Sequence, residues 1–143
     1  MKAKKISKDT RRRCLDFLVA HHISYNCGAL TREYLPKSEA LAKYDDKEKK
    51  LCLLAWDLLR ADDDWGDCKS HIKDLEQYTD ELFRLENLTT SRDAYFLLYD
   101  KRFEVEQEIE EAYDKVEKLE DDMLGMEMDF DFYTGHVEKW MRL

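Results

Sequence analysis

The sequence predicts an all-α fold: a small helical bundle with a long antiparallel, coiled-coil-like hairpin and a short C-terminal amphipathic helix. One proline and four glycines in 143 residues leave long stretches without a helix breaker. Charged residues make up 40% of the chain, against roughly 25% in average globular proteins, and apolar residues recur at helical steps of three and four. The length predicts one domain, residues 1–143, with a basic head at residues 1–6 that is expected to be flexible.

The first predicted helix covers residues 7–23. Ser7 or Asp9 supplies a side-chain oxygen for the N-cap, and residues 26–28 end the segment because Gly28 suits a left-handed C-terminal position. The apolar stripe of this helix consists of Cys14, Leu15, Leu18 and Val19.

A second helical region is predicted over residues 37–61, after Pro36 stops any helix from running through. Ser38 offers the N-cap. The region is either continuous or interrupted at Asp45 and Asp46, and its apolar positions recur at helical spacing.

The stretch "ADDDWGD", residues 61–67, predicts a turn because three acids are followed by Gly66. Asp67 would then cap a helix over residues 67–88. The apolar positions of that helix are Cys68, Ile72, Leu75, Leu82 and Leu85.

The longest predicted helix covers residues 91–126, with Thr90 and Asp93 forming a capping box in which Asp replaces Glu. Residues 95–99 are apolar on every side, which predicts that this part is buried. Further on, steps of four and three alternate over three heptads, as in a coiled-coil seam. The seam consists of Val105, Ile109, Ala112, Val116, Leu119, Met123 and Met126.

The two hairpin helices differ in predicted length. At about 1.5 Å per residue, the 91–126 helix measures about 54 Å and the 67–88 helix about 33 Å. An overhang of about 20 Å is therefore expected, and it carries the acidic residues. The 37–61 helix, the tail, a second copy or a foreign partner must cover its seam.

The tail "FYTGHVEKWMRL", residues 132–143, predicts a short amphipathic helix. Its apolar positions are Tyr133, Val137, Trp140 and Met141. Folding back onto the bundle is the prediction, and binding to a partner as a peptide is the alternative.

The net charge of −9 is unevenly distributed, with +6 over residues 1–13 and −11 over residues 104–131. So acidic a body repels a phosphate backbone and attracts basic surfaces, which leaves the head for any contact with nucleic acid. Arg11, Arg12 and Arg13 either bind phosphate, lie in solvent, or neutralise the acidic body within the chain.

The acidic residues around the seam are the candidate partner-binding site. Glu111 with Lys115 and Asp114 with Lys118 have the favourable order for helical ion pairs. Acidic flanks would repel each other in a self-paired seam, so a neutral or basic neighbour is expected, from a partner or from Lys43, Lys47, Lys49 and Lys50. The candidate residues are Glu106, Glu108, Glu110, Glu111, Asp114, Glu117, Glu120, Asp121 and Asp122.

No catalytic, cofactor or metal site is predicted. The glycines are isolated, which argues against a phosphate-binding loop. Cys14, His21 and His22 lack the paired spacing of a zinc site, and Ala61 stands where a calcium loop that places Gly66 at its sixth position needs its first ligand. Glu-x-x-Glu pairs such as Glu108 with Glu111 arise by chance among so many acids.

The cysteines Cys14, Cys27, Cys52 and Cys68 are far apart, and no signal peptide or membrane span is visible. We expect a reduced, cytoplasmic protein with free thiols, a disulfide framework being the alternative.

Together these features predict a non-enzymatic protein-binding module that uses an acidic helical surface. One form is an inhibitor from a phage or mobile element, anti-CRISPR-like, that occupies the basic nucleic-acid-binding groove of a partner protein, in the host cytoplasm. The alternatives are a coiled-coil scaffold or homodimer, and nucleic-acid binding through the basic N-terminus.

Overall fold

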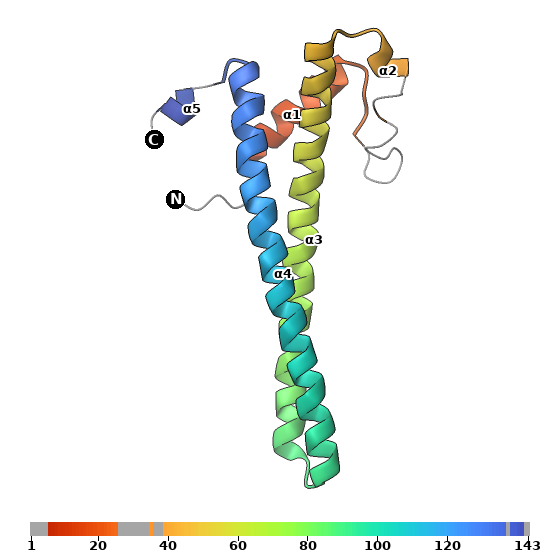
Figure 1. The fold of residues 1–143 in the computed structure, drawn as a ribbon, viewed down its shortest axis with the longest axis vertical. Helices are drawn as coiled ribbons and strands as arrows, with labels where there is room; N and C mark the ends of the chain where they lie inside the picture. Colours follow the sequence, from red (N-terminus) through yellow and green to blue (C-terminus); the bar gives the residue numbers. More distant parts are fainter. Residues whose placement is uncertain (1–5, 26–34, 36–38, 137, 142–143) are drawn as a thin grey trace. The chain divides into compact units, whose positions relative to one another are not determined.

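The computed structural model describes residues 6–25, 35, 39–136 and 138–141. Over this part of the chain the secondary structure is helical, with no strand, which confirms the all-α prediction (Figure 1). The helices are α1 (Lys8–Ala20), α2 (Glu39–Ala42), α3 (Asp46–Leu88), α4 (Arg92–Tyr133) and α5 (Glu138–Met141).

The chain forms two compact units. Unit 1 comprises Met1–Asp64 with Leu119–Leu143, and unit 2 comprises Trp65–Lys118. The long helices α3 and α4 each contribute to both units, and unit 2 is a helical hairpin of the two.

Helix α1 begins as predicted and ends earlier than predicted. The Ser7 side chain accepts a hydrogen bond from the Thr10 amide at 3.1 Å, which confirms the Ser7 N-cap. At the other end, the Ile23 amide donates to the Leu18 carbonyl at 2.8 Å and the His22 amide donates to the Val19 carbonyl at 2.9 Å. These bonds form a Schellman motif in which His22, at φ 61°, takes the left-handed position.

The predicted stop at residues 26–28 lies outside the described residues, but the helix has already ended at Ala20. Cys14 and Leu18 of the predicted stripe are fully buried. Val19 is 65% exposed, so its assignment to the stripe is wrong. The Schellman motif uses the Val19 backbone, and Ile23, whose amide bonds to Leu18, is buried in its place.

Of the two alternatives for residues 37–61, the structure shows the interrupted one, since α2 ends at Ala42 and α3 begins at Asp46. The Asp45 carboxylate accepts a hydrogen bond from the Glu48 amide at 2.8 Å, which caps α3. The N-cap predicted at Ser38 lies outside the described residues.

The predicted turn at residues 61–67 is wrong, because α3 continues through this stretch to Leu88. Arg11 of α1 forms ion pairs with Asp62 at 2.7 Å and Asp63 at 3.0 Å. These ion pairs offset the negative charge of two acids that would otherwise favour a helix end. Gly66 costs a helix interior only about 1 kcal/mol, so Asp67 lies within the helix instead of capping one.

The predicted overhang is wrong for the same reason. Helix α3 has 43 residues and α4 has 42, so the lengths match to within one residue. Helix α4 also runs seven residues beyond the expected end at Met126. At its start, the Ser91 hydroxyl accepts from the Ala94 amide at 3.2 Å, so Ser91 and not Thr90 is the N-cap.

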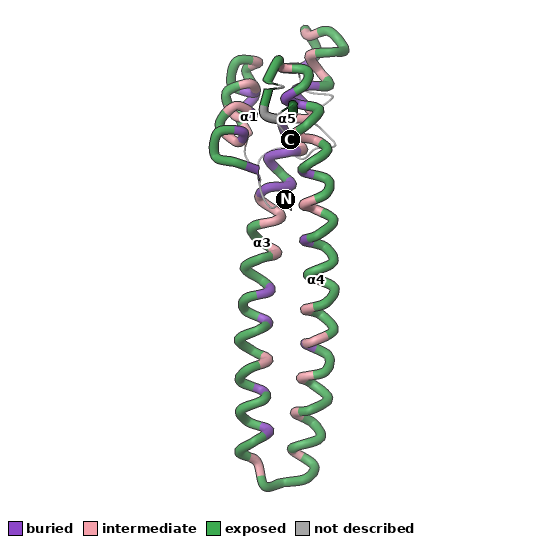
Figure 2. The backbone as a smooth tube through the Cα atoms, turned by 90° about the vertical axis from the view of Figure 1, so that its left-hand side faces the viewer, coloured by how far each residue is buried: buried purple, intermediate pink, exposed green. Residues whose placement is uncertain are grey.

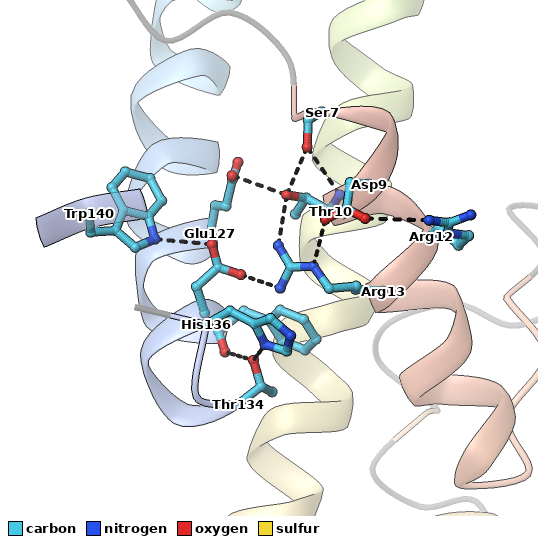
Figure 3. Close-up of polar contacts among 11 residues, drawn as sticks. Ser7, Asp9, Thr10, Arg12, Arg13, Glu127, Thr134, His136 and Trp140 are labelled. Carbon is cyan, nitrogen blue, oxygen red and sulfur yellow. Dashed lines mark hydrogen bonds and ion pairs between the residues drawn. The ribbon is translucent and has the colours of Figure 1, made fainter. Parts of the chain in front are cut away.

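In unit 1 the tail folds back, as predicted for Trp140. The Trp140 indole donates to buried Asp131 at 3.0 Å, and Arg13 of α1 pairs with the same carboxylate at 2.6 Å. Figure 3 shows these contacts beside the bond from Thr10 to Glu127, at 3.2 Å. The described helix of the tail is α5, and Tyr133 belongs to α4, while Val137 lies outside the described residues.

The predicted seam is confirmed, since each of its seven residues is buried or half-buried. In unit 2, Val105 packs against Leu75 and Leu82 of α3. Figure 2 shows the buried and half-buried residues of the hairpin on the facing sides of the two helices. In unit 2 the seam therefore packs α4 on α3 along one side.

The predicted burial of residues 95–99 is wrong. Within unit 2 a single helix, α3, packs on this part of α4, so the other sides have no cover from the unit. Leu98, at a seam position, is half-buried against the core, whereas Phe96 is 50% exposed and Leu97 is 72% exposed.

The described cysteines of unit 1 lie in the core. Cys14 and Cys52 are fully buried free thiols, while Cys68 of unit 2 is half-buried. Burial raises the pKa of Cys14 from 9.0 to about 12 and the pKa of Cys52 to about 11. Cys27 lies outside the described residues.

Iodoacetamide at pH 8 should therefore label Cys68 well before Cys14 and Cys52 in the folded protein. The reagent cannot reach the two buried thiols, and their raised pKa values keep them protonated at this pH. Peptide mass mapping reads each site separately, and equal labelling in urea is the control. Native labelling of Cys14 as fast as Cys68 would contradict this assignment.

The free energy of unfolding should also depend on pH. It should fall as the pH rises from about 9, where the thiols of the unfolded chain ionise, towards the raised pKa values of Cys14 and Cys52 in the folded protein.

Candidate protein-binding surface

Unit 2 carries a face of exposed acids on α4. Their side chains lie at positions outside the seam, so the packing of α4 on α3 leaves them in solvent. Among the described residues, no ion pair or hydrogen bond involves any of these five side chains. This acidic face consists of Glu108, Glu110, Glu111, Asp114 and Glu117.

The charge density of the acidic face is high along the helix axis. Residues 108–117 rise about 13.5 Å, so the five acids follow one another on average every 3.4 Å or so of helix axis, spread over about half of the helix circumference. One strand of B-DNA carries a phosphate every 3.4 Å or so along its axis. The ion pairs expected for Glu111 with Lys115 and for Asp114 with Lys118 are not formed among the described residues.

The other four predicted site residues lie elsewhere. Glu106 is half-buried and accepts a hydrogen bond from Arg102 at 2.9 Å, so it is engaged within the fold. Glu120, Asp121 and Asp122 belong to unit 1, where Glu120 is half-buried and the two aspartates are exposed.

Unit 2 as a whole has fifteen acids and eight bases, a net charge of −7. The lysines proposed as an internal neighbour, Lys43, Lys47, Lys49 and Lys50, all lie in unit 1. Two of them, Lys47 and Lys50, line a cavity with Asp129 and Tyr133.

A groove of about 420 Å³ borders the acidic face. Cys68 and His71 lie three residues apart on α3, a spacing that places both on one side of the helix. The sequence did not predict this pair, because residues 61–67 were expected to form a turn and the following residues the capped start of a helix. The described residues contain no group of three His, Cys, Asp or Glu side chains arranged to bind a metal ion. The groove is lined by Asp67, Cys68, His71, Glu108, Glu111, Ala112 and Lys115.

Two of the arginines that follow the basic head, Arg11 and Arg13, are engaged within unit 1. Arg11 pairs with Asp62 and Asp63, and Arg13 pairs with Asp131. These contacts support the hypothesis of internal neutralisation for these two residues. Arg12 is 73% exposed and pairs only with Asp9, and Lys2, Lys4 and Lys5 lie outside the described residues.

A buried ion pair lies in the seam of unit 2. Glu86 of α3 is 4% exposed, and Arg102 of α4 donates to both of its oxygens, through Nη2 at 3.2 Å and through Nε. The hydrogen bond to Glu86 raises the pKa of Arg102, so its guanidinium stays charged. Arg102 stands three residues before Val105, at a seam position, which is the signal that sequence reasoning passed over.

Comparison with protein families, curated proteins and solved structures finds no match to this chain. In the described part of the chain, every helix falls short of the length and apolar character needed to cross a membrane.

Arg102→Leu should destabilise the protein by about 3–5 kcal/mol, because it leaves the Glu86 carboxylate buried without a partner. Urea unfolding followed by circular dichroism measures the change. The double variant Glu86→Leu/Arg102→Leu should recover most of the loss, since an apolar pair leaves no buried charge. Arg84→Leu is the matched control, because its pair with Glu81 is exposed and its loss should change stability far less. An Arg102→Leu variant as stable as the control would contradict a buried pair.

Proposed function

We propose that this protein is a non-enzymatic binding module whose acidic face docks on a basic surface of another protein. One observation carries the proposal: five exposed carboxylates on one rigid helix have no partner among the described residues, in a unit of net charge −7. Charges placed to stabilise the fold would be paired, as those of Glu86 and Arg102 are.

A fixed row of charges suits such binding. The seam holds α4 in place, so little conformational entropy is lost when a partner binds. Complementary charge accelerates encounter and selects against acidic partners. The strand-like spacing of the carboxylates favours a partner that normally binds nucleic acid, which is how an anti-CRISPR-like inhibitor encoded by a phage or mobile element would act in the host cytoplasm.

Reversing charge on the acidic face should abolish this binding. The protein is used to capture partners from a cell lysate, bound proteins are eluted with salt, and the identified partner is purified and titrated. Glu110→Lys/Glu117→Lys should weaken the partner at least about a hundredfold, since like charges then face each other. The matched control is Asp74→Lys/Asp80→Lys, which changes the charge of unit 2 equally at exposed positions of α3.

Two outcomes would contradict the proposal. In one, both double variants weaken the partner equally, which makes net charge and not the acidic face responsible. In the other, the acidic-face variant binds as the wild type does. If the protein imitates nucleic acid, an oligonucleotide that binds the partner must compete with this protein for the same site on the partner.

A further inference from the structure

Unit 2 carries a second exposed surface, made of aromatic side chains from both helices near the turn of the hairpin. Their exposed fractions lie between 41% and 55%. This aromatic face consists of Phe83, Tyr95, Phe96, Tyr99 and Phe103. It is separate from the acidic face, which begins at Glu108.

Four of the five rings are linked by contacts with one another or with Arg102. Tyr95 stacks with Tyr99 at 6.4 Å between ring centroids and meets Phe96 edge-on at 5.6 Å. The Arg102 guanidinium lies 5.4 Å from the ring centroids of both Phe83 and Tyr99, so it joins the two helices across the face.

The arrangement on α4 follows from helical spacing. Steps of three and four residues join Phe96 to Tyr99 and Tyr99 to Phe103, which places these rings on one side of the helix. Leu97 is 72% exposed but lies about 145° around the helix from the middle of that side.

The area of the aromatic face is close to what an interface needs. An aromatic side chain presents about 150–250 Å², so five half-exposed rings offer about 500 Å². That is at the upper end of the apolar patches that monomers leave in water, about 300–600 Å². Two such faces in contact would bury about 1,000 Å² in total, the lower bound for a specific protein interface.

The charge around the aromatic face favours contact with an identical surface. Residues 81–103 contain four acids and four bases, so their net charge is zero. The whole charge of −7 on unit 2 comes from the remaining residues, 65–80 and 104–118. Two copies that meet through residues 81–103 therefore avoid the repulsion that disfavours self-pairing along the acidic seam.

We propose that the aromatic face is the interface of a homodimer. A two-fold interface requires one surface to be complementary to itself, and this face supplies both partners of a cation–π contact. Exposed Arg92 lies 5.6 Å from the Phe96 ring centroid, so this cation of one copy can meet exposed rings of the other, while Arg102 is held by Glu86 within its own chain. Aromatic residues and arginine are also the residues enriched where binding energy concentrates.

The dimer goes beyond the binding function proposed above and does not depend on it. Where the acidic face of each copy stays accessible, one particle would present two acidic faces. A partner with two basic sites would then be bound more tightly than by a monomer, through effective concentration.

Sedimentation velocity of the full chain over a range of concentrations, at low and at high salt, tests the proposal. The wild type should form a dimer whose stability does not fall as salt rises, because apolar contacts are not screened. Phe96→Ser/Phe103→Ser should weaken dimerisation at least about tenfold. The control Leu97→Ser, an exposed apolar residue on another side of the same helix, should leave it unchanged, and circular dichroism shows that each variant is folded.

Each opposing result overturns the proposal. A wild-type chain that stays monomeric up to its solubility limit excludes the dimer. If that monomer binds lipid vesicles, the aromatic face contacts a membrane surface instead of a second copy. A dimer that persists in the Phe96→Ser/Phe103→Ser variant uses another surface. A dimer lost equally in Leu97→Ser, or dissolved by salt, is not built on the aromatic face.

Discussion

The ion pairs from Arg11 to Asp62 and Asp63 are the interaction on which the long helices depend. The three consecutive aspartates at residues 62–64, with Gly66 two residues later, would otherwise favour a turn. With two of the three acids held by α1, helix α3 continues to Leu88 and offers α4 a neighbour in each unit. The acidic residues of α4 therefore form a lateral face on a packed helix, and the expected projecting end does not exist.

What could be predicted from the sequence is what local spacing determines. The seam from Val105 to Met126, the Ser7 cap and the break before Asp46 each follow from residues a few positions apart. The errors at residues 61–67 and 95–99 have a different origin, since each depends on which helices meet. An arginine fifty residues away decides the first, and the second arises because one helix covers only one side of α4. The candidate site was partly predicted for the same reason, as five of its nine residues lie together on an exposed side of unit 2.

The two surfaces of unit 2 would act through different forces. The acidic face works through long-range attraction that salt screens over about 8–10 Å at physiological ionic strength. The aromatic face works through apolar burial, which requires contact and tolerates salt. Binding to a partner and self-association would therefore respond differently to salt, and variants at the two faces can separate them.

The aromatic face depends on the register of the hairpin, which the apolar seam alone specifies poorly. A heptad pattern repeats, so sliding α4 by seven residues would still bring apolar positions together. Such a slip would set Glu86 against Tyr95 or Ile109 in place of Arg102 and leave its carboxylate buried without a partner, at a cost of several kcal/mol. The Glu86–Arg102 pair thus selects one register. The same register places Phe83 beside Arg102 and Tyr99, so the residue that aligns the two helices also assembles the aromatic face from both of them.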